Sequence, residues 1–288
     1  MARINSNGLP FSNRSSNASF LYPIFFTIII SMVLVQLILL VKSYQEGPLL
    51  SLQKSFTTST ILNLLVVSVL SAIVLFILFR IRKISDKTAA KALIALFIEG
   101  GMLAILLFGK LLFISLGLET PIFLIFVAVV AYIGTYFAFL AFVDSLSQKA
   151  RNRLFVISSG SLGSFIGLLI PILPVIGISI ILAITDIFLI QTAFFQRMLG
   201  DAKHEKIIIE MAFSTNEWGI GIGDLICYSM IVSSTSANYG ILAGSLSLLF
   251  ILTGALLTMK LTAKQRQVPG LPIATALGIL PSILVLIL

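Results

Sequence analysis

The chain has few charged residues, one cysteine and one histidine. Charged side chains make up 10% of its 288 residues, whereas a soluble domain contains roughly 25%. The only cysteine is Cys227, so the chain cannot form an internal disulfide bond. Since His204 is the only histidine, the sequence offers no set of His and Cys ligands for a metal ion. We therefore expect no metal and no other cofactor.

Hydrophobic residues account for 58% of the chain and form long runs from residue 20 to the C-terminus. Only helices and closed barrels cross a bilayer, because the backbone polar groups must be satisfied within the protein. Barrel strands alternate apolar and polar residues, whereas these runs are continuously apolar over about 20 residues, the length of a spanning helix. The sequence predicts an all-α, polytopic membrane protein.

Nine segments are expected to span the membrane. They form a single domain over residues 20–288, after a polar tail at residues 1–19 that does not have the pattern of a cleaved signal peptide. A proline at each end of residues 171–174 marks a break between the fifth and sixth spans, and residues 238–240 separate the seventh from the eighth. The predicted spans are residues 20–41, 59–80, 92–115, 121–143, 154–172, 174–196, 218–237, 239–259 and 268–288.

The positions of the basic residues predict the orientation. Sixteen of the 19 Lys and Arg residues lie in the N-terminal tail or near the ends of the second, fourth, sixth and eighth spans. Nine spans bring these segments to one side, and the positive-inside rule makes that side the cytoplasm. We expect a cytoplasmic N-terminus and an external C-terminus, in the cell membrane if the protein is prokaryotic. The basic residues that give the net charge of +8 then set the membrane orientation and do not indicate binding of nucleic acid.

Two aspartates interrupt consecutive apolar spans: Asp186 in the sixth and Asp224 in the seventh. A charged side chain at membrane depth costs at least a few kcal/mol, and such residues are functional by default. Asp186 lies roughly 16 Å of helix from the cytoplasmic end of its span, and Asp224 roughly 10 Å. Because the two spans are antiparallel and joined by a short cytoplasmic loop, we expect the two carboxyl groups to face each other.

Two carboxyl groups in a low-dielectric site share a proton and titrate as a pair. One member can accept a proton from water while the other donates a proton to the oxygen of the scissile carbonyl, as in soluble aspartic proteases. This chemistry needs no metal. We interpret Asp186 and Asp224 as the catalytic pair of an intramembrane aspartyl protease.

Glycines precede the second aspartate at alternate positions: Gly219, Gly221 and Gly223. Without side chains there, a substrate backbone can approach closely and the helix end is loosened. Considered alone, the three glycines are better explained as ordinary packing contacts. The same explanation is expected for Gly163 and Gly167 in the fifth span.

A helix-breaking segment, Pro269-Gly270-Leu271-Pro272, opens the ninth span. The two prolines prevent regular helix, so backbone groups there can pair with an extended substrate. A plain turn before the last helix is the alternative. The predicted topology puts this segment, the glycines and both aspartates in the cytoplasmic part of the bundle.

This combination resembles the presenilin and signal peptide peptidase family of intramembrane aspartyl proteases, most of all its archaeal homologues. That family has nine spans, a catalytic Asp in the sixth, a Gly-x-Gly-Asp motif in the seventh and a Pro-Ala-Leu motif opening the ninth. The matches here are Asp186, Gly221-Ile222-Gly223-Asp224 and Pro269-Gly270-Leu271. The chain departs from the family pattern at Thr185, where the family has Tyr, and at Gly270, where it has Ala.

The resemblance implies hydrolysis of peptide bonds within transmembrane helices of membrane proteins or signal peptides. Each substrate helix would have to unwind locally before cleavage. By resemblance the catalytic residues are Asp186 and Asp224, and the substrate-binding residues are Gly221, Ile222, Gly223, Pro269, Gly270, Leu271 and Pro272. The basic residues favour the presenilin-like orientation. A stand-alone enzyme is implied, and a homo-oligomer is compatible with the sequence.

Two other functions remain open. Acidic residues within spans also mark the pathways of ion- or proton-coupled transporters, although the chain shows no internal repeat. A catalytically inactive relative that binds helices is left open by Thr185. Glu99, in the third span, is expected to form a hydrogen bond within the bundle or to be protonated, with a direct functional role as the alternative. Residues 206–213 suit either a strand that holds the substrate or, as the favoured alternative, an interfacial segment.

Overall fold

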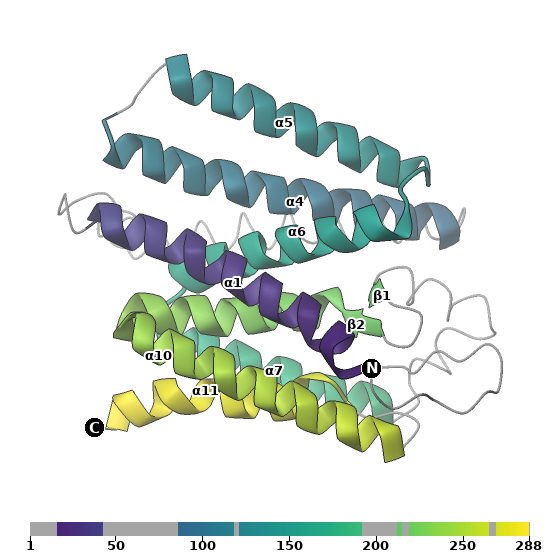
Figure 1. Cartoon of the computed structure of the whole chain (residues 1–288), viewed down its shortest axis with the longest axis vertical. Coiled ribbons are helices and arrows are strands. Elements are labelled where there is room, and N and C mark those ends of the chain that lie inside the picture. Colours follow the sequence, from purple (N-terminus) through teal and green to yellow (C-terminus); the bar gives the residue numbers. More distant parts are fainter. Residues whose placement is uncertain are drawn as a thin grey trace. The chain divides into compact units, whose positions relative to one another are not determined.

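The computed structural model describes residues 16–42, 86–117, 121–191, 212–214, 219–264 and 269–287. These residues are almost entirely helical, which confirms the all-α prediction. The described ranges contain seven helices and one two-stranded sheet (Figure 1). The predicted second span, at residues 59–80, lies outside the described residues, so the count of nine stays a prediction.

The described elements comprise seven helices and two strands. Their bounds are α1 Ser16–Lys42, α4 Asp86–Ser115, α5 Pro121–Phe142, α6 Gln148–Leu169, α7 Ile172–Gln191, β1 Ala212–Ser214, β2 Gly219–Gly221, α10 Ile222–Lys264 and α11 Leu271–Ile287.

Five of these helices are long and apolar enough to cross a membrane. Their apolar stretches are Phe20–Leu40, Ala90–Ile114, Pro121–Phe142, Gln148–Leu169 and Ile222–Thr262, and shorter apolar helices cover Ile172–Phe188 and Leu271–Ile287. Large hydrophobic side chains remain exposed along them, among them Leu124, Tyr132 and Leu242. A surface of this kind matches a lipid environment and not water.

Several helices begin earlier than their predicted spans. Residues 16–19 belong to α1 and not to the polar tail, α4 starts at Asp86 instead of residue 92, and α6 starts at Gln148 instead of residue 154. Hydropathy detects only the apolar part of a helix, whereas a polar first turn can leave its unpaired N–H groups to water or to a cap. Ser147 is such a cap, accepting a hydrogen bond from the Ala150 N–H at 3.3 Å.

The helix α10 contains the predicted seventh and eighth spans. Its backbone leaves the helical conformation at Gly240, with φ 87° and ψ 171°, a region that favours glycine. The chain reverses there, and Figure 1 shows the two halves of α10 side by side. A Cβ atom on Gly244 would collide with the side chain of Ser236 in the preceding half. The predicted break at residues 238–240 is therefore confirmed, although the first predicted helical residues, 219–221, form β2 instead.

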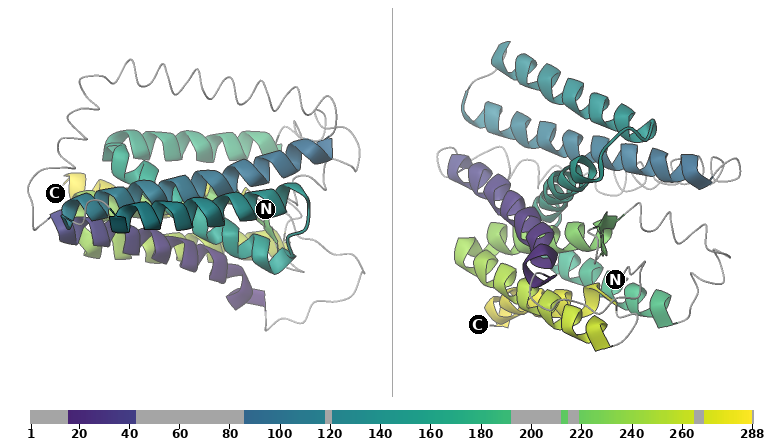
Figure 2. Two further views of the ribbon diagram at one scale, coloured as in Figure 1. Left: turned by 90° about the horizontal axis from the view of Figure 1, so that it is seen from above. Right: turned by 45° about the vertical axis from the view of Figure 1, so that its right-hand side comes forward.

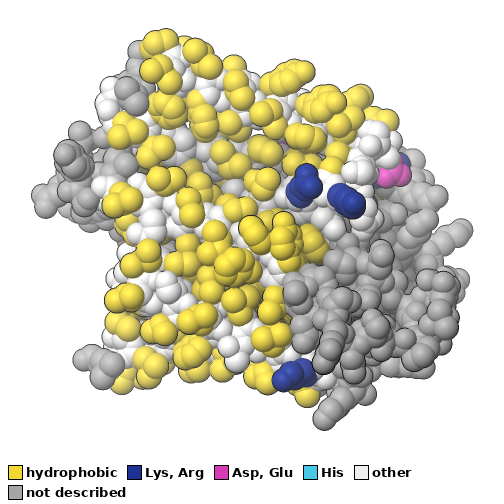
Figure 3. Space-filling model, viewed as in Figure 1, with side chains coloured by type: hydrophobic (Ala, Val, Ile, Leu, Met, Phe, Trp, Pro, Cys, Tyr) yellow, Lys and Arg dark blue, Asp and Glu magenta, His cyan; other side chains and the backbone are white. Residues whose placement is uncertain are grey.

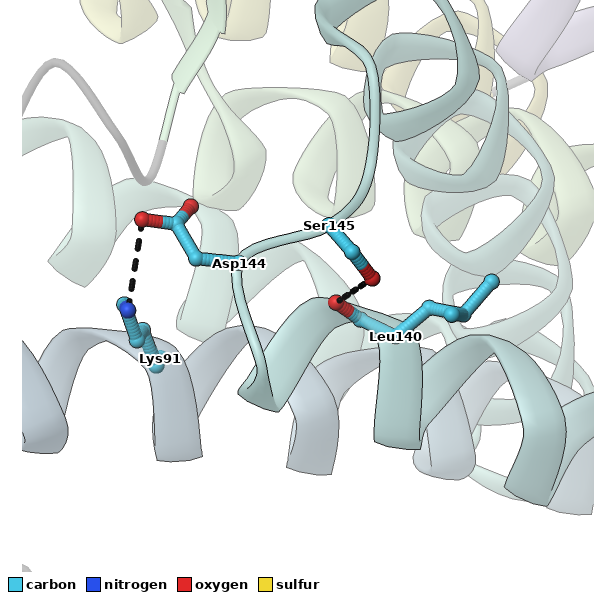
Figure 4. A network of polar contacts seen from close by, with 4 residues as sticks. All are labelled: Lys91, Leu140, Asp144 and Ser145. Atoms are coloured by element: carbon cyan, nitrogen blue, oxygen red, sulfur yellow. Dashed lines mark hydrogen bonds and ion pairs between the residues drawn. The ribbon is translucent and has the colours of Figure 1, made fainter.

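The chain divides into two compact units, Leu37–Leu146 and the remainder. In the first, α4 packs on α5. The α4 residue Glu99 lies beside Gly134, whose added Cβ atom would be 3.3 Å from a Glu99 carboxylate oxygen. Asp144, after α5, forms an exposed ion pair of 3.2 Å with Lys91 (Figure 4).

In the other unit, α6 packs on the first half of α10 through small residues. A Cβ atom on Gly163 would lie only 2.5 Å from the Ser229 Cβ, and one on Gly167 would collide with Ser233. Across the contact, the Ser233 hydroxyl donates a hydrogen bond to the Gly163 carbonyl at 3.3 Å. Small residues permit this close approach of helix backbones in membranes. The structure thus confirms the packing role expected of the two glycines of α6.

The helices α7, α10 and α11 lie side by side, as the views of Figures 1 and 2 agree. Hydroxyl groups join α10 to α11: Thr235 and Ser282 share a hydrogen bond of 2.7 Å, and Ser247 donates one of 2.6 Å to the Gly278 carbonyl. These buried bonds fix α11 against both halves of α10. They therefore determine where the first residue of α11, Leu271, meets the other two helices.

Candidate active site

The first aspartate of the predicted pair contacts the segment that opens α11. Asp186 lies in α7, is partly buried, and its Oδ2 atom accepts a hydrogen bond of 3.1 Å from the Leu271 N–H. Leu271 is the first residue of α11, where backbone N–H groups have no partner within the helix and the helix dipole favours negative charge. Two predicted site segments, separated by 85 residues, thus share one hydrogen bond.

A tyrosine joins the same segment to the helix of the second aspartate. The Tyr228 hydroxyl donates a hydrogen bond of 3.1 Å to the Gly270 carbonyl. Tyr228 is 2% exposed and lies four residues after Asp224, one helical turn along α10. Gly270 and Leu271 are therefore held from two sides, through the carbonyl by Tyr228 and through the N–H by Asp186.

Asp224 occupies the first turn of α10, directly after β2. Its carboxyl group receives a backbone hydrogen bond from Gly221 and interacts electrostatically with Asp186. An added Cβ atom on Gly221 would lie 3.5 Å from the Asp224 Cγ, and one on Gly223 would meet nothing within 4 Å. No tight packing contact thus accounts for these two glycines.

A short antiparallel sheet leads into the site. β1 pairs with β2 in the register Ala212↔Gly221, Phe213↔Ile220 and Ser214↔Gly219. The predicted strand at residues 206–213 is found only at its end, where Ala212 and Phe213 belong to β1; residues 206–211 lie outside the described ranges. The predicted strand is therefore found at these two residues.

The remaining predicted residues lie around this centre. Ile222 begins α10 and is buried, Pro269 is half-buried, and Pro272 follows Leu271 in the first turn of α11, where a proline is tolerated. The Thr185 hydroxyl donates a hydrogen bond of 2.7 Å to the Ile181 carbonyl of its own helix. The threonine that replaces the family tyrosine is thus engaged within α7. Within the described ranges, no three His, Cys, Asp or Glu residues cluster as metal ligands.

Sequence reasoning missed Tyr228. Its hydroxyl would have few partners in an apolar helix, and buried tyrosines usually place the O–H group on a hydrogen-bond acceptor. The signal that could have identified it is the spacing of four residues from Asp224, which puts both side chains on one face of α10.

These observations define a helical membrane protein in which two aspartates from neighbouring helices interact beside a helix-breaking segment. The structure is similar to two crystal structures of a presenilin family intramembrane aspartate protease, in space groups P2 and C222. The P2 form matches with a TM-score of 0.61 at 18% identity, over 95% of this chain and 98% of that chain. For the C222 form the TM-score is 0.50 at 20% identity, over 93% and 97%.

At these identities the likeness establishes the fold: the chain has the fold of a presenilin family protease and is an integral membrane protein. No protein-family profile matches the chain, and no curated protein sequence matches it either.

Proposed function

We propose that the chain is an intramembrane aspartyl protease of the Gly-x-Gly-Asp type, with Asp186 and Asp224 as its catalytic pair. The observation that carries the proposal is the meeting of three distant segments: Asp186 bonds to Leu271, Tyr228 bonds to Gly270, and Asp224 interacts with Asp186. The fold shared with a presenilin family protease supports it independently. If the two neighbouring carboxyl groups had only a structural role, no functional gain would offset the free-energy cost of their desolvation.

The proposed reaction uses one ionised and one protonated carboxyl group. The ionised one takes a proton from a water molecule held between the pair, while the protonated one donates to the carbonyl oxygen of the scissile peptide. The attacking water becomes the hydroxyl of the tetrahedral intermediate, and collapse of that intermediate breaks the C–N bond. Hydrogen bonds from Leu271 and Gly221 hold the two carboxyl groups in place before the substrate arrives.

The proposed substrate is a transmembrane helix of another protein or a signal peptide, unwound near the cut. An unwound segment has unpaired backbone groups, and it can satisfy them by adding to the edge of a sheet. β2 runs directly into the turn that carries Asp224. A substrate strand laid along β2 would pass Gly223, where an added side chain would meet nothing within 4 Å. The substrate backbone would occupy this space.

The proposed topology has nine spans, with a cytoplasmic N-terminus and an external C-terminus. Its support is the distribution of basic residues and the reversal of α10 at Gly240. On this topology the site lies towards the cytoplasmic side of the membrane.

Cleavage by purified protein tests the proposal. The full-length chain is reconstituted into liposomes with a labelled transmembrane peptide, and products are identified by mass spectrometry. The expected result is cleavage by the wild type and none by Asp186→Asn or Asp224→Asn. Asparagine has nearly the same shape as aspartate and keeps an oxygen that accepts a hydrogen bond, so the contact of residue 186 with the Leu271 N–H survives. It has no carboxyl group that could take up or donate the catalytic proton.

Asp144→Asn is the matched control, because it removes a carboxyl group from an exposed ion pair outside the site. It should cleave as the wild type does. Cleavage that persists in both site variants would refute the assignment of the pair. Ion flux without cleavage would indicate a transporter, and peptide binding without cleavage an inactive relative.

A further inference from the structure

A pocket lies on the unit that carries the candidate site, between α1, α6 and β1. Its volume is about 360 Å³. Ligand pockets commonly range from ~300 to 1,000 Å³. The residues that matter for its chemistry are Tyr22 and Phe26 of α1, Lys149, Asn152 and Arg153 of α6, and Phe213 of β1.

One wall of the pocket is basic. Lys149 and Arg153 are four residues apart in the first turns of α6, so their side chains leave the same face of the helix about 5–6 Å apart at Cβ. No described acidic residue lines the pocket. Figure 3 shows dark blue basic side chains over the beginning of α6, bordered by yellow hydrophobic side chains. Two cations at this spacing can hold one phosphate group between them.

The opposite wall is apolar and faces outward. Tyr22 is 51% and Phe26 is 41% exposed, and the two rings contact each other at 4.4 Å between centroids. Both belong to the apolar stretch Phe20–Leu40 of α1. Aromatic residues at the end of a membrane helix typically lie at the level of the lipid headgroups. The pocket therefore has a cationic part beside a surface suited to acyl chains.

We propose that this pocket binds the headgroup of an anionic phospholipid, with the phosphate between Lys149 and Arg153 and the acyl chains along Tyr22 and Phe26. Charge complementarity selects the occupant. A zwitterionic phospholipid carries the same phosphate but adds an ammonium group, which the two cations repel. A free phosphate lacks the chains that would cover the aromatic wall.

The pocket is connected to the candidate active site through β1. Phe213 contributes to the pocket and is 6% exposed, and it pairs with Ile220 of β2. The next residue, Gly221, bonds to the carboxyl of Asp224. A lipid packed on Phe213 favours the paired state of the two strands, and thereby the site that follows them. This coupling rests on the proposed function, whereas lipid binding itself does not.

Native mass spectrometry of the full-length protein in detergent measures the binding. The probes are phosphatidylglycerol and phosphatidylcholine with identical acyl chains. We expect phosphatidylglycerol to be retained in preference, and the double variant Lys149→Gln/Arg153→Gln to bind it about 25-fold more weakly, since each cation near an anionic headgroup contributes about fivefold. Equal retention of the two lipids by the wild type would overturn the proposal.

The control is Lys110→Gln/Lys260→Gln, which removes two exposed cations that do not line the pocket. It should bind phosphatidylglycerol as the wild type does, and an equal loss would show that general surface charge is responsible. Complete displacement of the lipid by inorganic phosphate would show that the aromatic wall contributes nothing. Either result would overturn the pocket as a lipid site.

Hydrogen exchange of residues 219–221 measures the coupling between lipid binding and the pairing of β1 with β2. The Asp224→Asn variant is included because we expect it to bind lipid without cleaving the peptide. We expect slower exchange in phosphatidylglycerol than in phosphatidylcholine, and no difference in the Lys149→Gln/Arg153→Gln variant. Unchanged exchange would overturn the coupling alone. Absence of cleavage in every lipid, with lipid binding as expected, would overturn the proposed function and leave the lipid site in place.

Discussion

The substitution Tyr228→Phe removes one oxygen atom from the candidate site and leaves the ring. The lost hydroxyl is the donor to the Gly270 carbonyl, at 3.1 Å. Tyr228 is 2% exposed, so the phenyl ring fills the same buried space. Of the two hydrogen bonds described at Gly270 and Leu271, only the one between Asp186 and Leu271 then remains.

The magnitude follows from the energy of one hydrogen bond between helices. Such bonds contribute about 0.5–1.5 kcal/mol in soluble proteins and about 0.6 kcal/mol on average within a membrane. We expect Tyr228→Phe to lower the free energy of unfolding by an amount within this range. If the bond serves to hold Gly270 and Leu271 beside the aspartates, the same energy corresponds to a decrease in kcat of about threefold to tenfold.

The assay compares two variants in thermal unfolding and in cleavage of the labelled peptide. Thr235→Val is the control, because it removes a buried hydroxyl that bonds Ser282 across the same two helices, at 2.7 Å. Both variants should lose similar stability, and only Tyr228→Phe should lose kcat. KM should change little, since no contact with a distant part of the substrate is removed. Equal kcat in the two variants would refute the positioning role of Tyr228.

Two further predictions concern glycines. Gly163→Ala should lower the free energy of unfolding, measured in thermal melts, by about 1–3 kcal/mol, because the added methyl group meets Ser229 at 2.5 Å. Gly177→Ala is the control: an added Cβ atom there meets nothing within 4 Å. It should stabilise the protein by up to about 1 kcal/mol, because alanine is the better helix former. Gly223→Ala should leave the melting temperature unchanged but raise KM at least fivefold, since a clash with the substrate costs about 1 kcal/mol or more. An unchanged KM in the peptide assay would show that the substrate does not occupy the space beside Gly223.

The elements predictable from the sequence were those that depend on local properties. The apolar runs, the break around Pro171 and the reversal at Gly240 appear at the expected places. Each is determined by a few neighbouring residues, through hydropathy, the missing N–H of proline or the freedom of glycine. The contact of α7 with α10 was predictable too, because consecutive spans joined by a short loop run antiparallel beside each other.

What escaped prediction depends on contacts between distant segments. The hydrogen bond of Tyr228 to Gly270 joins residues 42 positions apart, and no local pattern specifies which carbonyl a tyrosine will reach. The strand β2 was included in a predicted helix because Gly219, Ile220 and Gly221 lie in an apolar run. Glycine is a poor helix former, and pairing with β1 supplies the backbone partners that a helix would otherwise provide.

The contact between Asp186 and Leu271 also bears on how the site can work. A carboxylate has two oxygens, and Oδ2 of Asp186 is held by the first N–H of α11. That bond fixes the orientation of the Asp186 carboxyl group relative to the first turn of α11. In the proposed reaction, Oδ1 of Asp186 would then be the oxygen that takes part in proton transfer. The helix-breaking segment at residues 269–272 would thus position Asp186 for the proposed reaction, in addition to offering its backbone to the substrate.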